Sequence, residues 1–165
     1  MKIKRFIKHL FALHWIATRA FPGRTLKAIE AAIRDSEKTH DGELRFAVEA
    51  GLHPLPLLRG QTTRQRAREV FAGLHVWDTE HNSGVLIYVQ LVDRRIEIVA
   101  DRGISVKVPQ KQWDAICRGI EHAYRNGEFE QGTLTGIREI TALLAAHFPP
   151  SGANPNELPD RPVVL

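Results

Sequence analysis

Acidic and amide side chains at alternate positions form the part of this sequence best suited to chemistry. Asp78, Glu80 and Asn82 are each separated by one residue, and Asp101 follows the hairpin that comes after them. Side-chain oxygens are the ligands that hard divalent cations such as Ca²⁺ and Mg²⁺ bind. The spacing is similar to the start of a calcium-binding loop, although Gly84 falls one place late and the distal bidentate glutamate is absent. These four oxygen-bearing residues therefore predict a divalent-cation site.

The same residues have other interpretations. An Asp- and Asn-rich turn in front of a strand is more often only a cap and a turn. Arg102 could hold a phosphate group or simply pair with the neighbouring carboxylates. If a cation held by Asp78 and Asp101 activates water while Arg102 steadies phosphate, the site would be that of a metal-assisted phosphatase. The two functional hypotheses are thus a cation-binding interaction module and a phosphatase with catalytic residues Asp78, Asp101 and Arg102.

Other catalytic and cofactor signatures are absent from the sequence. It contains no Gly-x-Gly-x-x-Gly, no Walker loop and no His-Glu-x-x-His motif. Cys117 is the only cysteine; Ala123, not an arginine, stands six places after it, and it lies beside an apolar helical stripe, as a packed thiol would. The histidines are dispersed, which argues against a zinc enzyme. We therefore expect no nucleotide cofactor, and no nucleic-acid-binding module is recognisable.

Hydrophobic periodicity predicts the elements that must position these residues. The strand over 43–50 is expected to be half-buried, with Glu43, Arg45 and Glu49 among its other positions, whereas Val85–Val92 should be covered on both faces. Arg64, Arg66 and Arg68 are interpreted as a solvated helix face. In chain order the elements are a helix over 24–39, a strand over 43–50, a helix from Thr62 or Thr63 to His75, strands over 85–92 and 95–100, and two helices that begin at Pro109 and near Leu134.

Strand directions bring the candidate residues together. A strand, helix and strand in succession form a crossover unit, so 43–50 and 85–92 should run parallel. A tight turn at Asp93-Arg94 makes 95–100 antiparallel to 85–92, with Asp101 opposite Leu86. The carboxylates of three distant segments should then meet at one end of the sheet. The fold predicted is a single-domain α/β/α sandwich with a small central mixed sheet covered by helices.

Charge and composition divide the chain into three parts. Hydrophobic residues at 43% and charged residues at 25% are ordinary for a globular domain. Residues 1–27 hold seven of the 23 Lys and Arg and no Asp or Glu, so the net charge of +4 comes from the amino-terminal end. We expect a basic amphipathic helix over 1–20, a domain over 21–150, and a Pro-rich tail over 151–165. The tail should be extended or disordered, although its last residues could add a strand to a sheet edge.

The basic amino-terminal helix has two interpretations. It could pack its apolar side on the domain, or residues 1–19 could lie on an anionic membrane or contact a membrane protein. No run approaches the length of a membrane span. His14 interrupts the apolar stretch and Ala17–Ala20 makes a poor cleavage site, so we expect no cleaved signal peptide. The predicted location is cytoplasmic or peripheral to the membrane.

Several of these segments resemble the TPM domain family, and in particular a bacterial branch of it. The resemblance covers about residues 20–150. It rests on Glu37, the runs Gly42–Phe46, Val76–Glu80 and Asn82–Tyr88, and Asp93-Arg94, Glu97-Ile98 and Asp101–Ile104.

The resemblance implies an α/β sandwich and an acidic cleft that binds divalent metal in some members. Carried over by position, that cleft corresponds to Asp78, Glu80, Asn82 and Asp101, and less closely to Asp93. Relatives include a thylakoid protein of photosystem repair with reported acid phosphatase activity and an auxiliary subunit of a nematode acetylcholine receptor. Many relatives have a cleaved signal and a transmembrane anchor, and this chain departs from them in showing neither.

Overall fold

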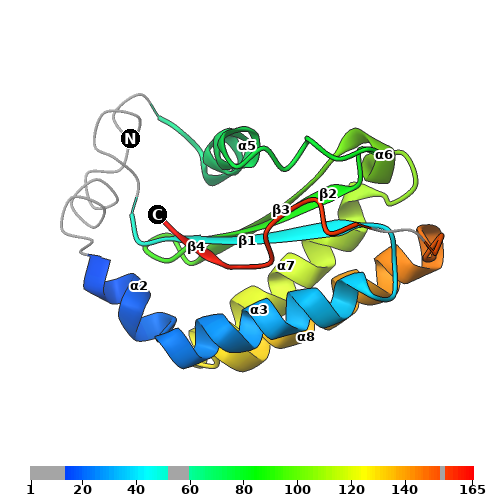
Figure 1. The fold of residues 1–165 in the computed structure, drawn as a ribbon. Helices are drawn as coiled ribbons and strands as arrows, with labels where there is room; N and C mark the ends of the chain where they lie inside the picture. Colours follow the sequence, from blue (N-terminus) through cyan, green and yellow to red (C-terminus); the bar gives the residue numbers. More distant parts are fainter. Residues whose placement is uncertain (1–13, 52–59, 153–154) are drawn as a thin grey trace.

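The chain folds as a mixed α/β domain with a four-stranded sheet between helices (Figure 1). The structure is a computed structural model that describes residues 14–51, 60–152 and 155–165. Its elements are α2 (His14–Ala20), α3 (Gly23–Glu37), β1 (Glu43–Glu49), α5 (Thr63–Gly73), β2 (Gly84–Gln90), β3 (Arg95–Ala100), α6 (Arg102–Ser105), α7 (Gln110–Arg125), α8 (Phe129–His147) and β4 (Val163–Val164). The predicted fold class is confirmed.

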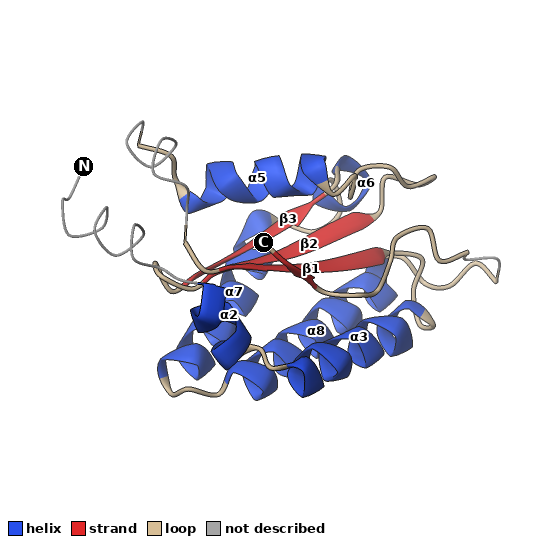
Figure 2. Cartoon of the chain, turned by 60° about the vertical axis from the view of Figure 1, so that its left-hand side comes forward, coloured by secondary structure: helices blue, strands red, loops and turns tan. Residues whose placement is uncertain are grey.

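The sheet has the strand order β3-β2-β1-β4. β1 runs parallel to β2 and β3 runs antiparallel to it, as the crossover and the hairpin predict. The helices α3, α7 and α8 cover one face, and α5 covers the other (Figure 2). β2 is buried along its whole length because it is a central strand between these two layers.

Apolar residues at helical and strand spacing explain the two layers. Trp113, Ile120 and Tyr124 lie on one stripe of α7 and pack with Ile29 and Ile33 of α3 in the larger core cluster. On the other face, Ala67 and Val70 of α5 pack against Leu86 and Tyr88 of β2. Alternate residues of β2 therefore point into two different cores.

The hairpin register differs from the predicted one by two residues. Ala100 lies opposite Val85, and the amide of Asp101 donates to the Gly84 carbonyl at 2.9 Å. The predicted turn at Asp93-Arg94 is too short, since Gln90 pairs with Arg95. Leu91 and Val92 instead donate their amides to the carbonyls of Glu49 and Ala50 at 3.1 Å each. Leu91 and Val92 therefore extend the pairing with the β1 side of the sheet and do not pair with β3.

The expected exposure of one side of β1 is also wrong. All seven residues of the strand are buried, including Glu43, Arg45 and Glu49 at 1%, 6% and 4% exposure. Two elements cover this face and give these polar groups partners. Arg66 of α5 reaches Glu49, and Arg45 donates to the Arg161 carbonyl at 3.2 Å.

The C-terminal segment, residues 155–165, closes the free edge of β1. Val163 and Val164 pair in parallel with Ala47 and Val48, and the amide of Leu165 donates to the Val48 carbonyl at 2.9 Å. The segment therefore adds a strand to the chain's own sheet, and the prediction of disorder is corrected over these residues. Figure 1 shows it in red alongside β1.

Candidate functional site

Three segments meet at the end of the sheet where β1 and β2 begin and β3 ends. Glu43 lies opposite Gly84, and the backbone of Asp101 bonds to Gly84 from the other side. The amide of Glu43 also donates to the Ser83 carbonyl at 3.1 Å. We call residues 78–84 and 101–103, which surround this end of β2, the rim.

Asp101 begins α6 and has one carboxylate oxygen without a partner. Its backbone is extended and its Oδ1 accepts the amide of Arg102 at 2.7 Å, so the side chain caps the short helix. Its Oδ2 is buried and has no hydrogen-bond partner. A buried carboxylate oxygen without a donor or a cation costs free energy. This oxygen is the strongest sign of a ligand at the rim.

Asn82 lies next to Asp101 through two hydrogen bonds to the start of α6. Its carbonyl accepts the Gly103 amide at 3.1 Å, and its side-chain Oδ1 accepts from Arg102 Nε at 2.8 Å. Asn82 adopts a φ of 51°, a conformation that asparagine tolerates better than most residues. The structure therefore brings Asn82, Asp101 and Arg102 together.

Local hydrogen bonds hold the loop in front of β2. The buried Thr79 accepts the Ser83 amide on its Oγ1 at 2.8 Å, and its carbonyl accepts the Asn82 amide at 3.2 Å. Asp and Asn are common in such turns, but here Thr79 supplies the side-chain acceptor of the turn, and Asp101, outside this loop, caps α6. The rim therefore contains both a hydrogen-bonded turn, built on Thr79, and a carboxylate oxygen of Asp101 that could bind a ligand.

Asp78 and Glu80 lie on an exposed part of this turn. The amide of Asp78 donates to the His75 carbonyl at 3.0 Å, and the amide of Glu80 donates to the Glu157 carboxylate at 2.8 Å. Across residues 14–51, 60–152 and 155–165, no three His, Cys, Asp or Glu side chains are grouped closely enough to hold a metal ion. The four predicted ligands therefore share one rim, but only Asn82 and Asp101 are joined, through Arg102.

Two residues near the rim were not found by sequence reasoning. Glu157 belongs to the tail that was expected to be extended or disordered, and no local pattern connects it to Glu80. Ser105 lies in α6, which was not predicted, and its hydroxyl donates to the Ala100 and Asp101 carbonyls at 3.0 and 2.9 Å. The contact of Glu157 depends on the tertiary fold, since Glu80 lies 77 residues away. The contacts of Ser105 are local, and they were missed because α6 was not predicted.

The predicted packed thiol is confirmed. Cys117 is buried, and burial raises the pKa of its thiol to about 12. A thiol with so high a pKa stays protonated at neutral pH and is a poor nucleophile.

The membrane-related predictions fall largely on residues 1–13, which lie outside the described part of the chain. Among the helices that the structure describes, none is both long and apolar enough to cross a membrane. The structure does place α2, which follows the basic residues, directly before α3 (Figure 1).

Comparisons with known proteins agree with the fold and the segments described above. A search of curated proteins finds no match. The BA42 protein from the psychrophilic bacterium Bizionia argentinensis, solved by NMR, is similar at 32% identity and a TM-score of 0.77. The match covers 88% of this chain and 95% of that one. The family model of the TPM domain matches residues 18–143. With most of its length inside that model, the chain belongs to the TPM domain family.

Proposed function

We propose that this chain is a divalent-cation-binding interaction module that acts at or near a membrane. The observation that carries the cation site is the buried Asp101 Oδ2, which has no hydrogen-bond partner. Ca²⁺ or Mg²⁺ would supply the missing positive charge, and both prefer oxygen ligands. The second ligand would be Asn82 Oδ1, which Arg102 Nε contacts at 2.8 Å.

The exposed carboxylates would complete such a site once Arg102 has released Asn82. The Arg102 side chain is exposed, so it can leave Asn82 at little cost when a cation arrives. Asp78 and Glu80 are exposed on the same turn, and a cation would draw their side chains towards Asp101. A bound ion would therefore link the loop before β2 to the start of α6. Such a link would present a different surface to a partner with and without the ion.

The metal-assisted phosphatase has less support. In that hypothesis Arg102 steadies phosphate, but its side chain lies on an open surface. A phosphatase site also needs a pocket that excludes water and orients the ester. Five cavities in the described part of the chain have linings that include none of Asp78, Asp101 and Arg102.

Titration with Ca²⁺ and separately with Mg²⁺, followed by the amide signals of the ¹⁵N-labelled chain, tests the cation site. We expect the amides of 78–84 and 101–103 to shift together. Asp101→Asn retains a side-chain oxygen for the α6 cap but removes the charge, so affinity should fall by about tenfold or more. Asp114→Asn, on the exposed side of α7, is the matched control and should bind as the parent does.

Two results would overturn the cation site. One is an absence of shifts at the rim with either ion, and the other is equal affinity in Asp101→Asn. Hydrolysis of a phosphate monoester by the parent chain, lost in Asp101→Asn, would instead support the phosphatase.

Sedimentation with anionic liposomes tests the membrane contact. Lys2, Lys4, Arg5 and Lys8 are replaced by glutamine in the full chain, which removes four positive charges without shortening it. We expect the parent chain to sediment with vesicles that contain phosphatidylserine and the variant to remain in solution, because each basic residue contributes about 1 kcal/mol near such a surface. Equal sedimentation of both chains contradicts the membrane contact and leaves the cation site untouched.

A further inference from the structure

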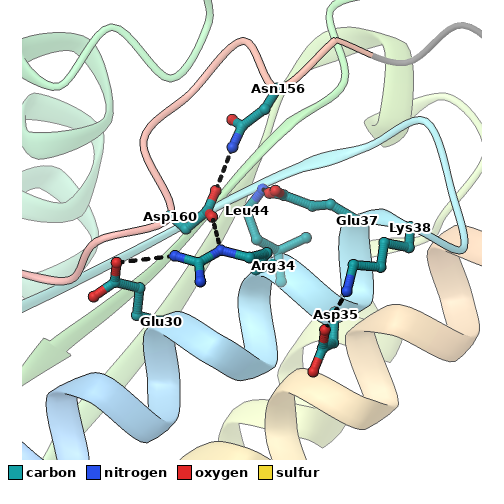
Figure 3. A network of polar contacts seen from close by, with 8 residues as sticks. All are labelled: Glu30, Arg34, Asp35, Glu37, Lys38, Leu44, Asn156 and Asp160. Carbon is teal, nitrogen blue, oxygen red and sulfur yellow. Dashed lines mark hydrogen bonds and ion pairs between the residues drawn. The ribbon is translucent and has the colours of Figure 1, made fainter.

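A cavity of about 420 Å³ lies between α3, the start of β1 and the chain after α8. Its lining includes Arg34, Glu37, Lys38, Glu43, Pro150 and Asn156. Figure 3 shows Arg34 and Glu37 extending from α3 towards the C-terminal segment, where Asn156 and Asp160 lie. A cavity of this volume can accommodate a small organic molecule.

The inner wall of the cavity is acidic. Glu43 is 1% exposed; its Oε2 accepts the Leu158 amide at 3.0 Å, and its Oε1 is buried with no hydrogen-bond partner. Glu37 Oε1 accepts the Leu44 amide at 2.8 Å. Burial raises the pKa of Glu37 to about 9, and it also raises the pKa of Glu43. In both cases burial is the largest cause of the shift, because it disfavours the ionised carboxylate.

The outer wall is basic. Lys38 Nζ contacts Asp35 at 2.6 Å, and both side chains are largely exposed, at 67% and 71%. Arg34 bridges Glu30 and Asp160 at 3.1 Å each. An exposed ion pair such as Lys38–Asp35 contributes about 1 kcal/mol or less, so Lys38 can exchange its partner for a ligand. Arg34 is paired with the buried carboxylate of Asp160, so we expect it to keep this partner when a ligand binds.

We propose that this cavity binds a small zwitterionic molecule, with a primary ammonium group at Glu43 Oε1 and a carboxylate at Lys38. The ammonium group has three hydrogen-bond donors, one of which Glu43 Oε1 could accept, and its positive charge favours an ionised carboxylate. An anion such as phosphate would meet carboxyl groups at the inner wall, which disfavours it.

The probe is 6-aminohexanoate, and hexylamine and hexanoate each carry one of its two charged groups. We expect 6-aminohexanoate to shift the amides of Leu44 and Leu158, which donate to the two carboxyls. Hexylamine should bind several-fold more weakly and hexanoate should not bind. Because the ammonium group favours the ionised carboxyls, the affinity should rise with pH around neutrality.

Two variants separate the inner contact from the outer one. Glu43→Gln keeps an acceptor for the Leu158 amide and should weaken 6-aminohexanoate and hexylamine alike, by about tenfold. Lys38→Met changes an exposed residue, so the fold should be retained. It should remove the preference for 6-aminohexanoate over hexylamine and leave hexylamine binding unchanged.

Three results would overturn this proposal. They are no shift of Leu44 and Leu158 at tens of millimolar ligand, equal binding of hexanoate and 6-aminohexanoate, or a preference for 6-aminohexanoate that persists in Lys38→Met. The last result applies even if Glu43→Gln does not fold. Asp101→Asn should bind 6-aminohexanoate as the parent does. The cavity proposal and the cation-site proposal are therefore tested independently.

Discussion

Single atoms decide what the rim can bind. Asp101 and Asn82 both bond to Arg102, and the backbone of Gly103 bonds to the Asn82 carbonyl. A Cβ on Gly103 would lie 2.5 Å from the His81 carbonyl oxygen and 2.7 Å from that of Asn82. The glycine therefore serves a close backbone contact, and any side chain there would push α6 away from the loop.

Gly103→Ala should consequently damage both stability and cation binding. We expect the free energy of unfolding to fall by about 2–4 kcal/mol, because the hydrogen bond from Gly103 to Asn82 cannot form without a clash. Gly119→Ala is the matched control. Its Cβ would meet no atom within 4 Å, and alanine in the middle of α7 should stabilise by about 0.5–1 kcal/mol. Urea unfolding measures both changes, and an equal effect of the two substitutions contradicts the assignment.

At the scale of elements, a buried polar cluster attaches α5 to the sheet. Arg66 donates to both oxygens of Glu49 at 2.9 and 3.0 Å, and the Tyr88 hydroxyl donates to the same carboxylate. Arg64 adds a hydrogen bond of 2.5 Å to the Ile98 carbonyl of β3. The predicted solvated face of α5 is therefore correct only for Arg68, which is exposed.

Arg66→Met tests this attachment. The substitution leaves Glu49 buried without its cation, and removing one partner of a buried pair costs about 3–5 kcal/mol. Arg68→Met makes the same chemical change two residues away on an exposed position, so its effect should stay within about 0.5 kcal/mol. Urea unfolding with amide exchange on α5 provides the readout. Similar losses in the two variants would show that the cluster does not hold the helix.

At the scale of the whole molecule, the C-terminal segment connects the sheet edge, α3 and the rim. It pairs with β1 through Val163 and Val164, and Asp160 bonds to Arg34 of α3. Glu157 accepts the Glu80 amide at the rim. This segment also lies against Glu43, whose Oε2 accepts the Leu158 amide at 3.0 Å, and its Asp160 lies near Glu37 of α3. Burial raises the pKa of both Glu37 and Glu43.

Stability should accordingly fall as the pH rises. The pKa of Glu37 is about 9 in the folded chain and 4.5 as the reference value for the unfolded one. Between these values the unfolded chain releases the proton and the folded chain retains it, so the stabilisation present below pH 4.5 is lost progressively up to about pH 9. Glu37→Gln removes this loss. The melting temperature of the variant minus that of the parent should therefore increase as the pH rises from 4.5 to about 9. Glu139→Gln, at an exposed position of α8, should show no such trend.

Local sequence patterns were enough to predict most of the helices and strands and the directions of β1, β2 and β3. Apolar spacing placed α3, α7 and α8, and the strand-helix-strand order made β1 and β2 parallel, because these features depend on neighbouring residues and on the handedness of the chain. The same reasoning brought residues 78–84 and 101–103 to one end of the sheet, and the motifs there indicated the TPM domain family.

The hairpin register, the burial of charged groups and the contacts of the tail depend on how distant segments pack against one another. The hairpin register differs from the predicted one by two residues because Leu91 and Val92 bond to the carbonyls of Glu49 and Ala50, which lie far away in the sequence. Glu43 and Glu49 are buried because α5 and the C-terminal segment cover them. Alternation within a strand cannot predict this burial. It shows that charged residues share one face, but not whether a distant segment packs on that face.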